Sequence, residues 1–452
     1  MGEFRFYAGV LLEHREVVEC FTRMFPDAPG HFLVSDNDVA RREHLGNVAT
    51  QLELTDDQML AMVAYDSSGA SLRTDPMVYI DPEAMGVRQH DNPAGIVFAP
   101  DKPLLFTDLC NINDWRQRSL QLQAEFELKV RVNLERLALH RDRFLPLPDR
   151  SLYFLPVHGW RIDERIAWYE AMLPVIDGIV GGIAVPGSPH SQVVPVESAV
   201  DGNAMLLQRQ LEYLAQSTLL PHFLGHERVH VFGQLGTRVL PLLVYLSVHV
   251  YEQVSSDSTT ITSHDAPNRM YWHPAGRYGH KRISLGQKAV EDERFVPLSD
   301  DYPACHCEFC ALTFGETKHL DCIPNESRLW LSRRFQRNVY DLAAANAGNS
   351  SADPEFIRLL TAHNLTMVRR EIAMLSDLAR DKRAFRKFLT DHELEATRNA
   401  VELIDTIVDE DADLGAFLAR VREWEAAVGI AAGTTVGRQD GCAGDAVSPS
   451  PA

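Results

Sequence analysis

Residues 151–159 read SLYFLPVHG, an apolar run that stops abruptly at a polar turn. Comparable apolar runs cover residues 59–65, 103–107, 176–180, 229–232 and 248–254. Continuous apolar runs of this length are typical of buried parallel strands. Helical patterns separate several of them, over residues 115–141, 163–173 and 203–219. Repeated βα units predict a parallel sheet, and this number of units favours a closed (β/α)8 TIM-type barrel over an open doubly wound sheet.

The rest of the chain divides into further regions. We expect the barrel to occupy residues 1–300, a zinc-binding insertion residues 301–363, and C-terminal helices that complete the barrel and its docking face residues 364–430. Helical patterns in that last part of the chain cover residues 355–378, 382–389, 393–407 and 413–427. Residues 431–452 are rich in Gly, Ala, Ser and Pro, a composition that predicts a disordered tail.

Composition narrows the class of protein. The 452 residues are 45% hydrophobic, enough for a sizeable core, and the net charge of −19 argues against nonspecific coating of nucleic acid. Neither a signal peptide nor a membrane span is visible in the sequence, so we expect a cytoplasmic protein without a membrane partner. The seven cysteines include three within six residues, which favours metal chemistry over disulfides.

The residues that follow the apolar runs are the candidate site, because the βα loops of a barrel converge at the carboxyl ends of its strands. Asp66, Asp108 and Asp257 all lie at such positions. Carboxylates held close together raise one another's pKa, and clusters of this kind commonly perform acid–base or nucleophilic chemistry. The alternative is that each Asp caps the helix that follows it.

A series of motifs resembles one known family. In chain order they are YDSSG (65–69), DLC (108–110), VHG (157–159), DGIVGGIAV (177–185), HVFG (230–233), SDSTT (256–260) with RMY (269–271), CHCEFC (305–310) and AHNL (362–365). This order resembles the tRNA-guanine transglycosylases, including the branch that inserts 7-deazaguanines into DNA. The resemblance covers about residues 66–372. It implies replacement of guanine in a nucleic acid, tRNA or DNA, by a free 7-deazaguanine base.

The resemblance assigns catalytic roles to two carboxylates. Asp257 would attack C1′ of the nucleoside and hold it covalently, as the nucleophile of a retaining glycosidase does. Asp66 would manage the proton of the departing and entering base. Glu252 competes for the nucleophile position, because YEQV (251–254) also aligns with the family's F-D-C-V motif. We prefer Asp257 for the Ser- and Thr-rich residues that follow it.

The resemblance also implies a base pocket. Asp108 would accept two hydrogen bonds from the guanine N1–H and 2-amino group. His158 stands where the family has Gln and would donate to the purine O6. The remaining pocket residues are Gly182 and Ile183, at the base edge, and Phe232 and Gly233, over the ring face. We interpret His230 as a core or rim residue and not as a site residue.

The cysteine motif predicts a structural Zn²⁺ site. Cys305, Cys307 and Cys310 bring three thiolates within reach of one tetrahedral ion. Spacing alone favours His319 or Cys322 as the fourth ligand, whereas the resemblance favours His363. Four protein ligands leave no open position for catalysis.

Charge is uneven along the chain. Residues 325–390 hold 12 Lys/Arg and 7 Asp/Glu, which makes them a candidate surface for a nucleic-acid backbone. An ordinary solvated helix face with i,i+4 ion pairs is the alternative. Two other functions stay open: a nucleosidase or base-exchange enzyme acting on free nucleosides, and an inactive zinc-containing partner subunit. The family also forms dimers through its zinc region, which implies a possible homodimer.

Overall fold

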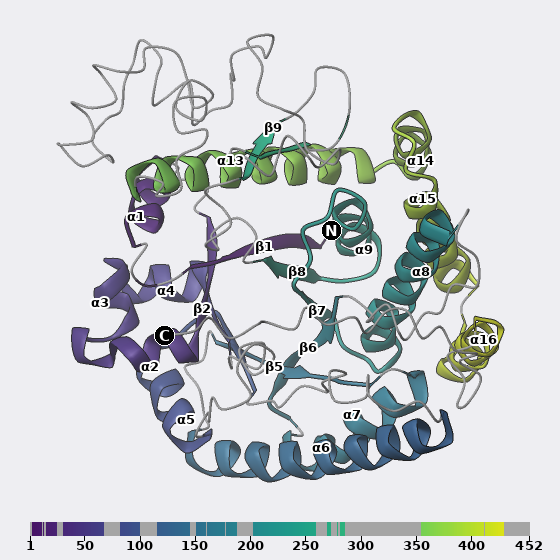
Figure 1. The fold of residues 1–452 in the computed structure, drawn as a ribbon, viewed down its shortest axis with the longest axis horizontal. Coiled ribbons are helices and arrows are strands. Elements are labelled where there is room, and N and C mark those ends of the chain that lie inside the picture. The colour runs from purple at the N-terminus through teal and green to yellow at the C-terminus, as the bar shows by residue number, and fades with distance from the viewer. Residues whose placement is uncertain are drawn as a thin grey trace, which may run out of the picture.

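Eight parallel strands close into a barrel that is surrounded by helices (Figure 1). The computed structural model describes residues 2–10, 12, 15–24, 30–66, 82–99, 115–144, 151–159, 161–176, 178–187, 202–258, 269–272, 278, 281–284, 354–410 and 412–428.

The strands follow one another around the barrel in chain order. They are β1 (Glu3–Gly9), β2 (His31–Ser35), β3 (Val63–Asp66), β4 (Ile96–Phe98), β5 (Leu152–Pro156), β6 (Val180–Pro186), β7 (Arg228–Phe232) and β8 (Gln253–Ser258). Each strand pairs in parallel with the next, and β8 pairs with β1 to close the ring. The closed parallel barrel with surrounding helices confirms the (β/α)8 architecture, and the alternative of an open sheet is wrong.

Helices fill the connections between consecutive strands. They are α1 (Arg15–Met24), α2 (Asp36–Arg42), the short 3-10 helix η2 (Glu43–Leu45), α3 (Val48–Leu52), α4 (Asp56–Met62), α5 (Pro82–Asp91), α6 (Trp115–Phe144), α7 (Ile162–Ile176), α8 (Gly202–Phe223) and α9 (Leu240–His249). Among the described residues, the next helix after β8 is α13 (Pro354–Ala379), which packs against α1 and α9. A short antiparallel hairpin, β9 (Arg269–Trp272) and β10 (Lys281–Ser284), precedes it, and β9 lies against α13.

Several predicted strands are shifted or wrong. Residues 59–62 belong to α4, which a capping box formed by Thr55 and Gln58 starts, so β3 begins at Val63. Ile176 ends α7, and β6 begins only at Val180, so the Gly pair at 181–182 opens this strand and does not follow it. Residues 248–249 end α9, and β8 starts at Gln253. The run at 103–107 lies outside the described residues, and β4 precedes it.

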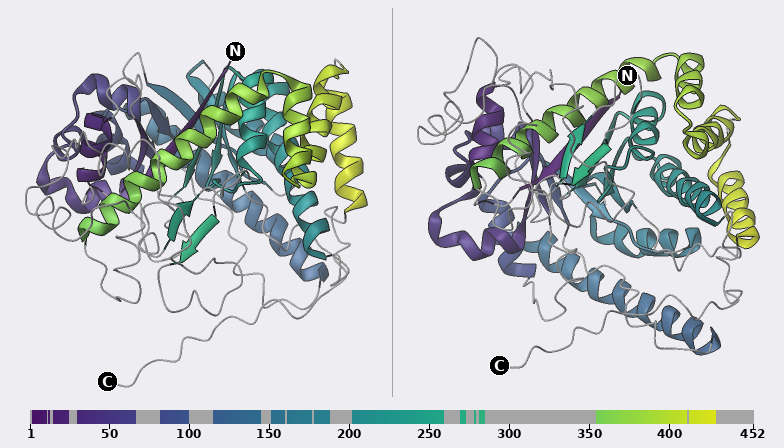
Figure 2. Two further views of the ribbon diagram at one scale, coloured as in Figure 1. Left: turned by 90° about the horizontal axis from the view of Figure 1, so that it is seen from above. Right: turned by 45° about the horizontal axis from the view of Figure 1, so that its top comes forward.

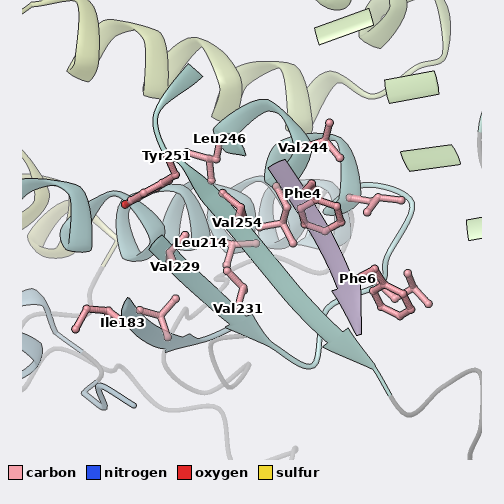
Figure 3. Close-up of a cluster of buried hydrophobic side chains, with 14 of the residues drawn as sticks. Phe4, Phe6, Ile183, Leu214, Val229, Val231, Val244, Leu246, Tyr251 and Val254 are labelled. Atoms are coloured by element: carbon pink, nitrogen blue, oxygen red, sulfur yellow. The ribbon is translucent and has the colours of Figure 1, made fainter. Parts of the chain in front are cut away.

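Alternation along the strands separates two apolar cores. Outward-facing side chains such as Val229, Val231 and Val254 pack against the helices, and Figure 3 shows them with residues of α8 and α9. Inward-facing side chains form a second, smaller cluster inside the barrel: Tyr7, Leu33, Ala64, Ile96, Phe98, Phe154 and Ala184. The interior of the barrel is therefore filled by side chains.

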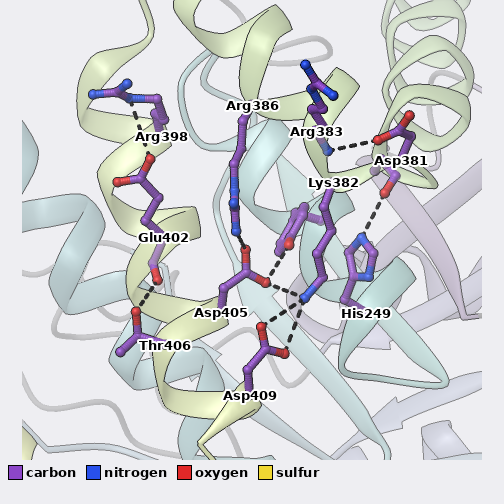
Figure 4. Close-up of polar contacts among 12 residues, drawn as sticks. His249, Asp381, Lys382, Arg383, Arg386, Arg398, Glu402, Asp405, Thr406 and Asp409 are labelled. Atoms are coloured by element: carbon purple, nitrogen blue, oxygen red, sulfur yellow. Dashed lines mark hydrogen bonds and ion pairs between the residues drawn. The ribbon is translucent and has the colours of Figure 1, made fainter.

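Three more helices cover one side of the barrel (Figure 2): α14 (Lys382–Asp391), α15 (Glu395–Asp409) and α16 (Leu414–Ala427). The helix α15 packs on α8 and α9, and a polar network fixes it there (Figure 4). Asp405, buried on α15, accepts hydrogen bonds from Tyr245 Oη at 2.6 Å and Lys382 Nζ at 2.7 Å, and it pairs with Arg386. Burial alone would raise the pKa of Asp405, but these donors hold it below its ordinary value.

The last helix, α16, is tied to the start of α7. Glu425, 5% exposed, accepts a hydrogen bond at 2.8 Å from the backbone N–H of Ile162, the first residue of α7. Arg422 pairs with Asp163 in the same turn. Burial raises the pKa of Glu425 above its ordinary value, although the hydrogen bond from Ile162 opposes that shift. The C-terminal helices therefore support the loop that follows β5.

The expected region boundaries can be placed only in part. The boundary between residues 363 and 364 falls inside the continuous helix α13, which belongs to the barrel. Of the C-terminal helices, α13 completes the ring, whereas α14–α16 form an outer layer. Residues 301–353 and 431–452 lie outside the described part. Among the helices that the structure describes, none is both long and apolar enough to cross a bilayer.

Candidate functional site

The carboxyl end of β8 carries a carboxylate that points into the barrel. Val254 faces the outer core, so alternation sends Ser255 and Asp257 to the interior. Asp257 is the second-last residue of β8 and lies beside Tyr7 of β1 in the sheet register. Its side chain is 13% exposed, so solvent or a ligand at the mouth of the barrel has access to it.

Two donors converge on one oxygen of this carboxylate. His230 Nε2 lies 3.1 Å from Asp257 Oδ1, and the backbone N–H of Gly233 donates to the same oxygen at 2.9 Å. On its other side, His230 Nδ1 lies 2.9 Å from the hydroxyl oxygen of Ser255. A hydrogen-bonded chain thus runs from Ser255 through the imidazole to Asp257.

His230 is completely buried among aromatic rings inside the barrel. Its ring centroid lies 4.7 Å from that of Phe98 and 4.9 Å from that of Phe232, both edge to face. Tyr7 is also nearby, and burial raises its pKa to about 12. The interpretation of His230 as a core or rim residue agrees with its burial, but it misses the contact with Asp257.

Asp66 ends β3 at the same end of the barrel. Ala64 belongs to the interior cluster, so Asp66, two residues later, also faces inward, and it is partly exposed. The preceding Tyr65 faces outward and donates a hydrogen bond at 2.9 Å to the buried Asp36, which Arg88 binds with two nitrogens. This outer network anchors the end of β3 and therefore the backbone that carries Asp66.

His158 also lies at the carboxyl end, two residues beyond β5, but it is buried, with only 7% exposed. Its ring meets the ring of Trp168 edge to face, with centroids 4.9 Å apart. Trp168 in turn donates a hydrogen bond at 3.1 Å to the backbone oxygen of Pro156. The structure thus places His158 against α7, near the mouth.

Gly182 and Ile183 lie away from this polar cluster. They pair with Phe154 and Leu155 of β5, and Ile183 also pairs with β7, in the amino-terminal half of β6. The Ile183 side chain is buried in the outer core. A Cβ on Gly182 would lie 2.6 Å from the ring of Phe154, so the absence of a side chain at this glycine makes room for that ring.

Phe232 and Gly233 do lie at the mouth. Phe232 ends β7 and is half-buried, whereas Gly233 is exposed. The backbone of Gly233 adopts φ of 71°, in the left-handed region that glycine tolerates best, and this turn directs its N–H toward Asp257. The resemblance assigns this pair to the ring face of a base, and Gly233 has this further contact with the carboxylate.

Glu252, the competing nucleophile, is at the other end of the barrel. It precedes β8, is 55% exposed, and pairs with Arg228 at the amino end of β7 at 2.6 Å. Its distance from Asp257, Asp66 and Gly233 removes it from the candidate site.

The expected zinc ligands are only partly described. Cys305, Cys307 and Cys310 lie outside the described residues, as does Asp108. His363 is on α13, with eight consecutive buried residues from 361 to 368, and is itself 0% exposed. Within the described part of the chain, no group of three or more His, Cys, Asp or Glu side chains could hold a metal ion.

The described basic residues near α14 are largely engaged in ion pairs. Asp405 and Asp409 neutralise Lys382, and Asp405 also pairs with Arg386. Lys387 pairs with Asp391 at i,i+4. Several of these acids lie beyond residue 390, so the positive balance counted over residues 325–390 overstates the charge of this surface.

Comparison with known proteins adds no assignment: neither the protein-family models nor the curated proteins contain a match to this chain.

Proposed function

We propose that the chain is a guanine transglycosylase, which exchanges guanine in a nucleic acid (tRNA or DNA) for a 7-deazaguanine base through a covalent intermediate on Asp257. The observation that carries this proposal is the partly exposed carboxylate at the end of β8, held by two donors on one oxygen. Asp66 supports it, because it projects inward at the same end of the barrel, three strands away around the ring.

Two displacements at C1′ would make up the reaction. In the first, an oxygen of Asp257 forms a bond to C1′ while the bond from C1′ to N9 of guanine breaks. The bonding pair leaves with guanine, which takes a proton from Asp66. In the second, the incoming base gives a proton to Asp66 and displaces the carboxylate from C1′, so each carboxyl group returns to its starting state.

The base would lie between these two carboxylates. We assign the recognition of its N1–H and 2-amino group to Asp108 and that of O6 to His158, as the resemblance implies. The buried position of His158 against Trp168 requires that the base reach it from the mouth of the barrel. Gly182 and Ile183 receive no role in our proposal, because the ring of Phe154 fills the space beside Gly182.

We also propose that Cys305, Cys307, Cys310 and His363 hold a structural Zn²⁺. A metal with four protein ligands would fix the chain that precedes α13 without taking part in the exchange. The burial of His363 suits a ligand shielded from solvent.

A nucleosidase or base-exchange enzyme acting on free nucleosides is the second candidate. The pairing of Lys382, Arg386 and Lys387 with acidic side chains favours it, because this pairing reduces the positive surface available to a phosphate backbone. The net charge of −19 points the same way. Both candidates use the same carboxylates and differ in the molecule that carries the guanine.

The test is incorporation of radiolabelled guanine into tRNA, duplex DNA or free guanosine, together with a denaturing gel that detects a covalent adduct when the incoming base is withheld. Asp257→Asn should abolish both exchange and adduct, because the proposed mechanism holds C1′ on this carboxylate. Asp66→Asn should slow turnover by about 10²–10⁴-fold, the usual scale for a general acid–base.

The matched control is Glu252→Gln, a substitution on the same strand segment but at the opposite end of the barrel. It should retain wild-type exchange and adduct formation. Loss of the adduct in Glu252→Gln with retention in Asp257→Asn would overturn the assignment of the nucleophile. Labelling of guanosine but of neither polynucleotide would establish the second candidate.

A further inference from the structure

We infer that His230 is a positioning residue for Asp257, which directs one oxygen of that carboxylate, Oδ2, toward the mouth of the barrel. The inference deepens the proposed function and rests on it. Both donors, His230 Nε2 and the backbone N–H of Gly233, fall on Oδ1. Among the residues that the structure describes, none donates to Oδ2.

The donors come from different kinds of structure, and together they fix the carboxylate plane. The imidazole is on β7, inside the barrel, whereas Gly233 is in the turn just beyond that strand. Rotation of the Asp257 side chain about its χ angles would break at least one of the two bonds. Oδ2 is consequently the oxygen left to form the bond to C1′, while Oδ1 becomes the carbonyl oxygen of the resulting ester.

Ser255 determines which nitrogen of His230 faces the carboxylate with a proton. Its hydroxyl oxygen lies 2.9 Å from Nδ1 and 3.5 Å from the backbone oxygen of Val229, so Nδ1 is the nearer of its two acceptors. A hydroxyl that donates to Nδ1 leaves the ring proton of a neutral imidazole on Nε2. In a charged imidazole both nitrogens carry protons. Nε2–H therefore donates to Asp257 in either state of the ring, and an N–H is present for the carboxylate throughout the reaction.

The surroundings keep this imidazole in place. His230 has 0% of its surface exposed, and Phe98 and Phe232 contact its ring edge to face. A hydrogen bond to a carboxylate is stronger where water is excluded, so a donor at this position holds the nucleophile more firmly than solvent would. A residue that only filled the core would need no hydrogen bond from a ring nitrogen, whereas both ring nitrogens of His230 have a partner.

The experiment measures the single-turnover rate of adduct formation on tRNA and on duplex DNA. His230→Leu fills the space without a donor and should slow adduct formation by about 10- to 100-fold, the worth of one hydrogen bond to a charged group. The KM for guanine and the affinity for the polynucleotide should stay within about 3-fold, because His230 contacts the nucleophile and not the base. His230→Gln should restore most of the rate, since its amide N–H can replace Nε2–H.

His249→Leu is the matched control. It removes another histidine hydrogen bond of similar length, 2.7 Å from Nε2 to the backbone oxygen of Ala379, at the interface of α9 with the end of α13. It should lower thermal stability without changing the rate of adduct formation. Ser255→Ala removes the hydrogen-bond partner of His230 Nδ1. It should slow adduct formation less than His230→Leu does, and it still tests the inference if His230→Leu fails to fold.

A second measurement does not depend on catalysis. Nitrogen chemical shifts of the His230 imidazole in the free protein should show a proton on Nε2, and Ser255→Ala should increase the share of the Nδ1–H form. An unchanged adduct rate in a folded His230→Leu, equal rates in His230→Leu and His230→Gln, or a wild-type proton confined to Nδ1 would each overturn the inference. If the wild-type protein forms no adduct, the proposed function fails, and the nitrogen shifts still decide the contact with Asp257.

Discussion

Replacement of Gly182 by Ala tests whether this glycine serves the barrel core or a base pocket. A Cβ at this position would lie 2.6 Å from both Cε1 and Cζ of Phe154 and 3.0 Å from the backbone oxygen of Arg228. Ordinary van der Waals contact begins at 3.4 Å. The ring of Phe154 would therefore have to move by most of an ångström, and the backbone of β7 leaves no room on the other side.

The expected cost follows from the surroundings of that ring. Phe154 is 0% exposed and belongs to the interior cluster, where its centroid lies 5.9 Å from that of Phe98. An added methyl group in a tightly packed core costs about 1–3 kcal/mol. We expect the upper part of this range, about 3 kcal/mol, because strands enclose the ring on all sides and the Arg228 backbone cannot yield.

Urea unfolding of four proteins measures this cost: wild type, Gly182→Ala, Phe154→Leu and the double variant. Phe154→Leu alone should lose about 1–2 kcal/mol through the space it leaves. In the double variant that space accommodates the new methyl group, so the loss should be about 2 kcal/mol smaller than the sum of the single losses.

Additive losses in the double variant, or a Gly182→Ala protein as stable as the wild type, would refute this account of the packing. A stable Gly182→Ala variant with a raised KM for guanine would instead place Gly182 at the base edge, as the resemblance implies. The two readings of this residue thus differ in stability and in kinetics.

Two further predictions concern the C-terminal helices and the metal. Because burial raises the pKa of Glu425 above its ordinary 4.5, its contribution to stability is present at low pH and is lost as the pH rises through the shifted pKa. Glu425→Gln keeps an acceptor for the N–H of Ile162, so in urea unfolding its stability relative to the wild type should increase as the pH rises above 4.5. A difference in stability that does not change with pH would contradict this. Elemental analysis should find about one zinc per chain, and Cys307→Ala should lower both metal content and thermal stability, because zinc binding contributes to folding. Wild-type protein without metal would rule out the zinc site.

Apolar continuity predicted some strands well and others poorly, for a physical reason. It found β5 and β7, which are short apolar runs bounded by polar turns. The same criterion placed β8 too early, over residues 248–254, because α9 is buried along most of its length and its apolar residues continue into that run. It missed β1 and β2, which alternate or carry polar ends: EFRFYAG and HFLVS. Continuity alone does not distinguish a buried helix from a buried strand.

Helices were easier to place because their ends carry local signals. Asp413 accepts from the N–H of Ala416 and starts α16, and Asp381 caps α14 in the same way. The helix predicted over residues 393–407 begins two residues later in the structure, at Glu395, because Glu393 adopts φ of 58° and cannot take part in a right-handed helix. Such backbone conformations depend on packing and leave little trace in composition.

The sequence predicted which strand ends carry acidic residues. It did not predict the contact between His230 of β7 and Asp257 of β8, because that contact depends on how the two strands pair. His230 was a detectable candidate: it lies two residues before Phe232, so both face the interior of a barrel. Its partner was not detectable, because alternation gives the face of each strand but not the relative shift of two strands. The observed register brings His230 beside Ser255 and within reach of Asp257.

The choice between Glu252 and Asp257 as the proposed nucleophile depends on their positions along β8 and on the directions of their side chains, and not on how well either one matches a sequence motif. Five residues separate them, which corresponds to about 16 Å along an extended strand. The five-residue separation is odd, so an extended strand would also turn the two side chains to opposite faces. Val254 faces the helices, and Glu252 would share its outward direction, whereas Asp257 shares the inward direction of Ser255. A nucleophile must lie at the mouth and face inward, and of these two carboxylates only Asp257 meets both conditions.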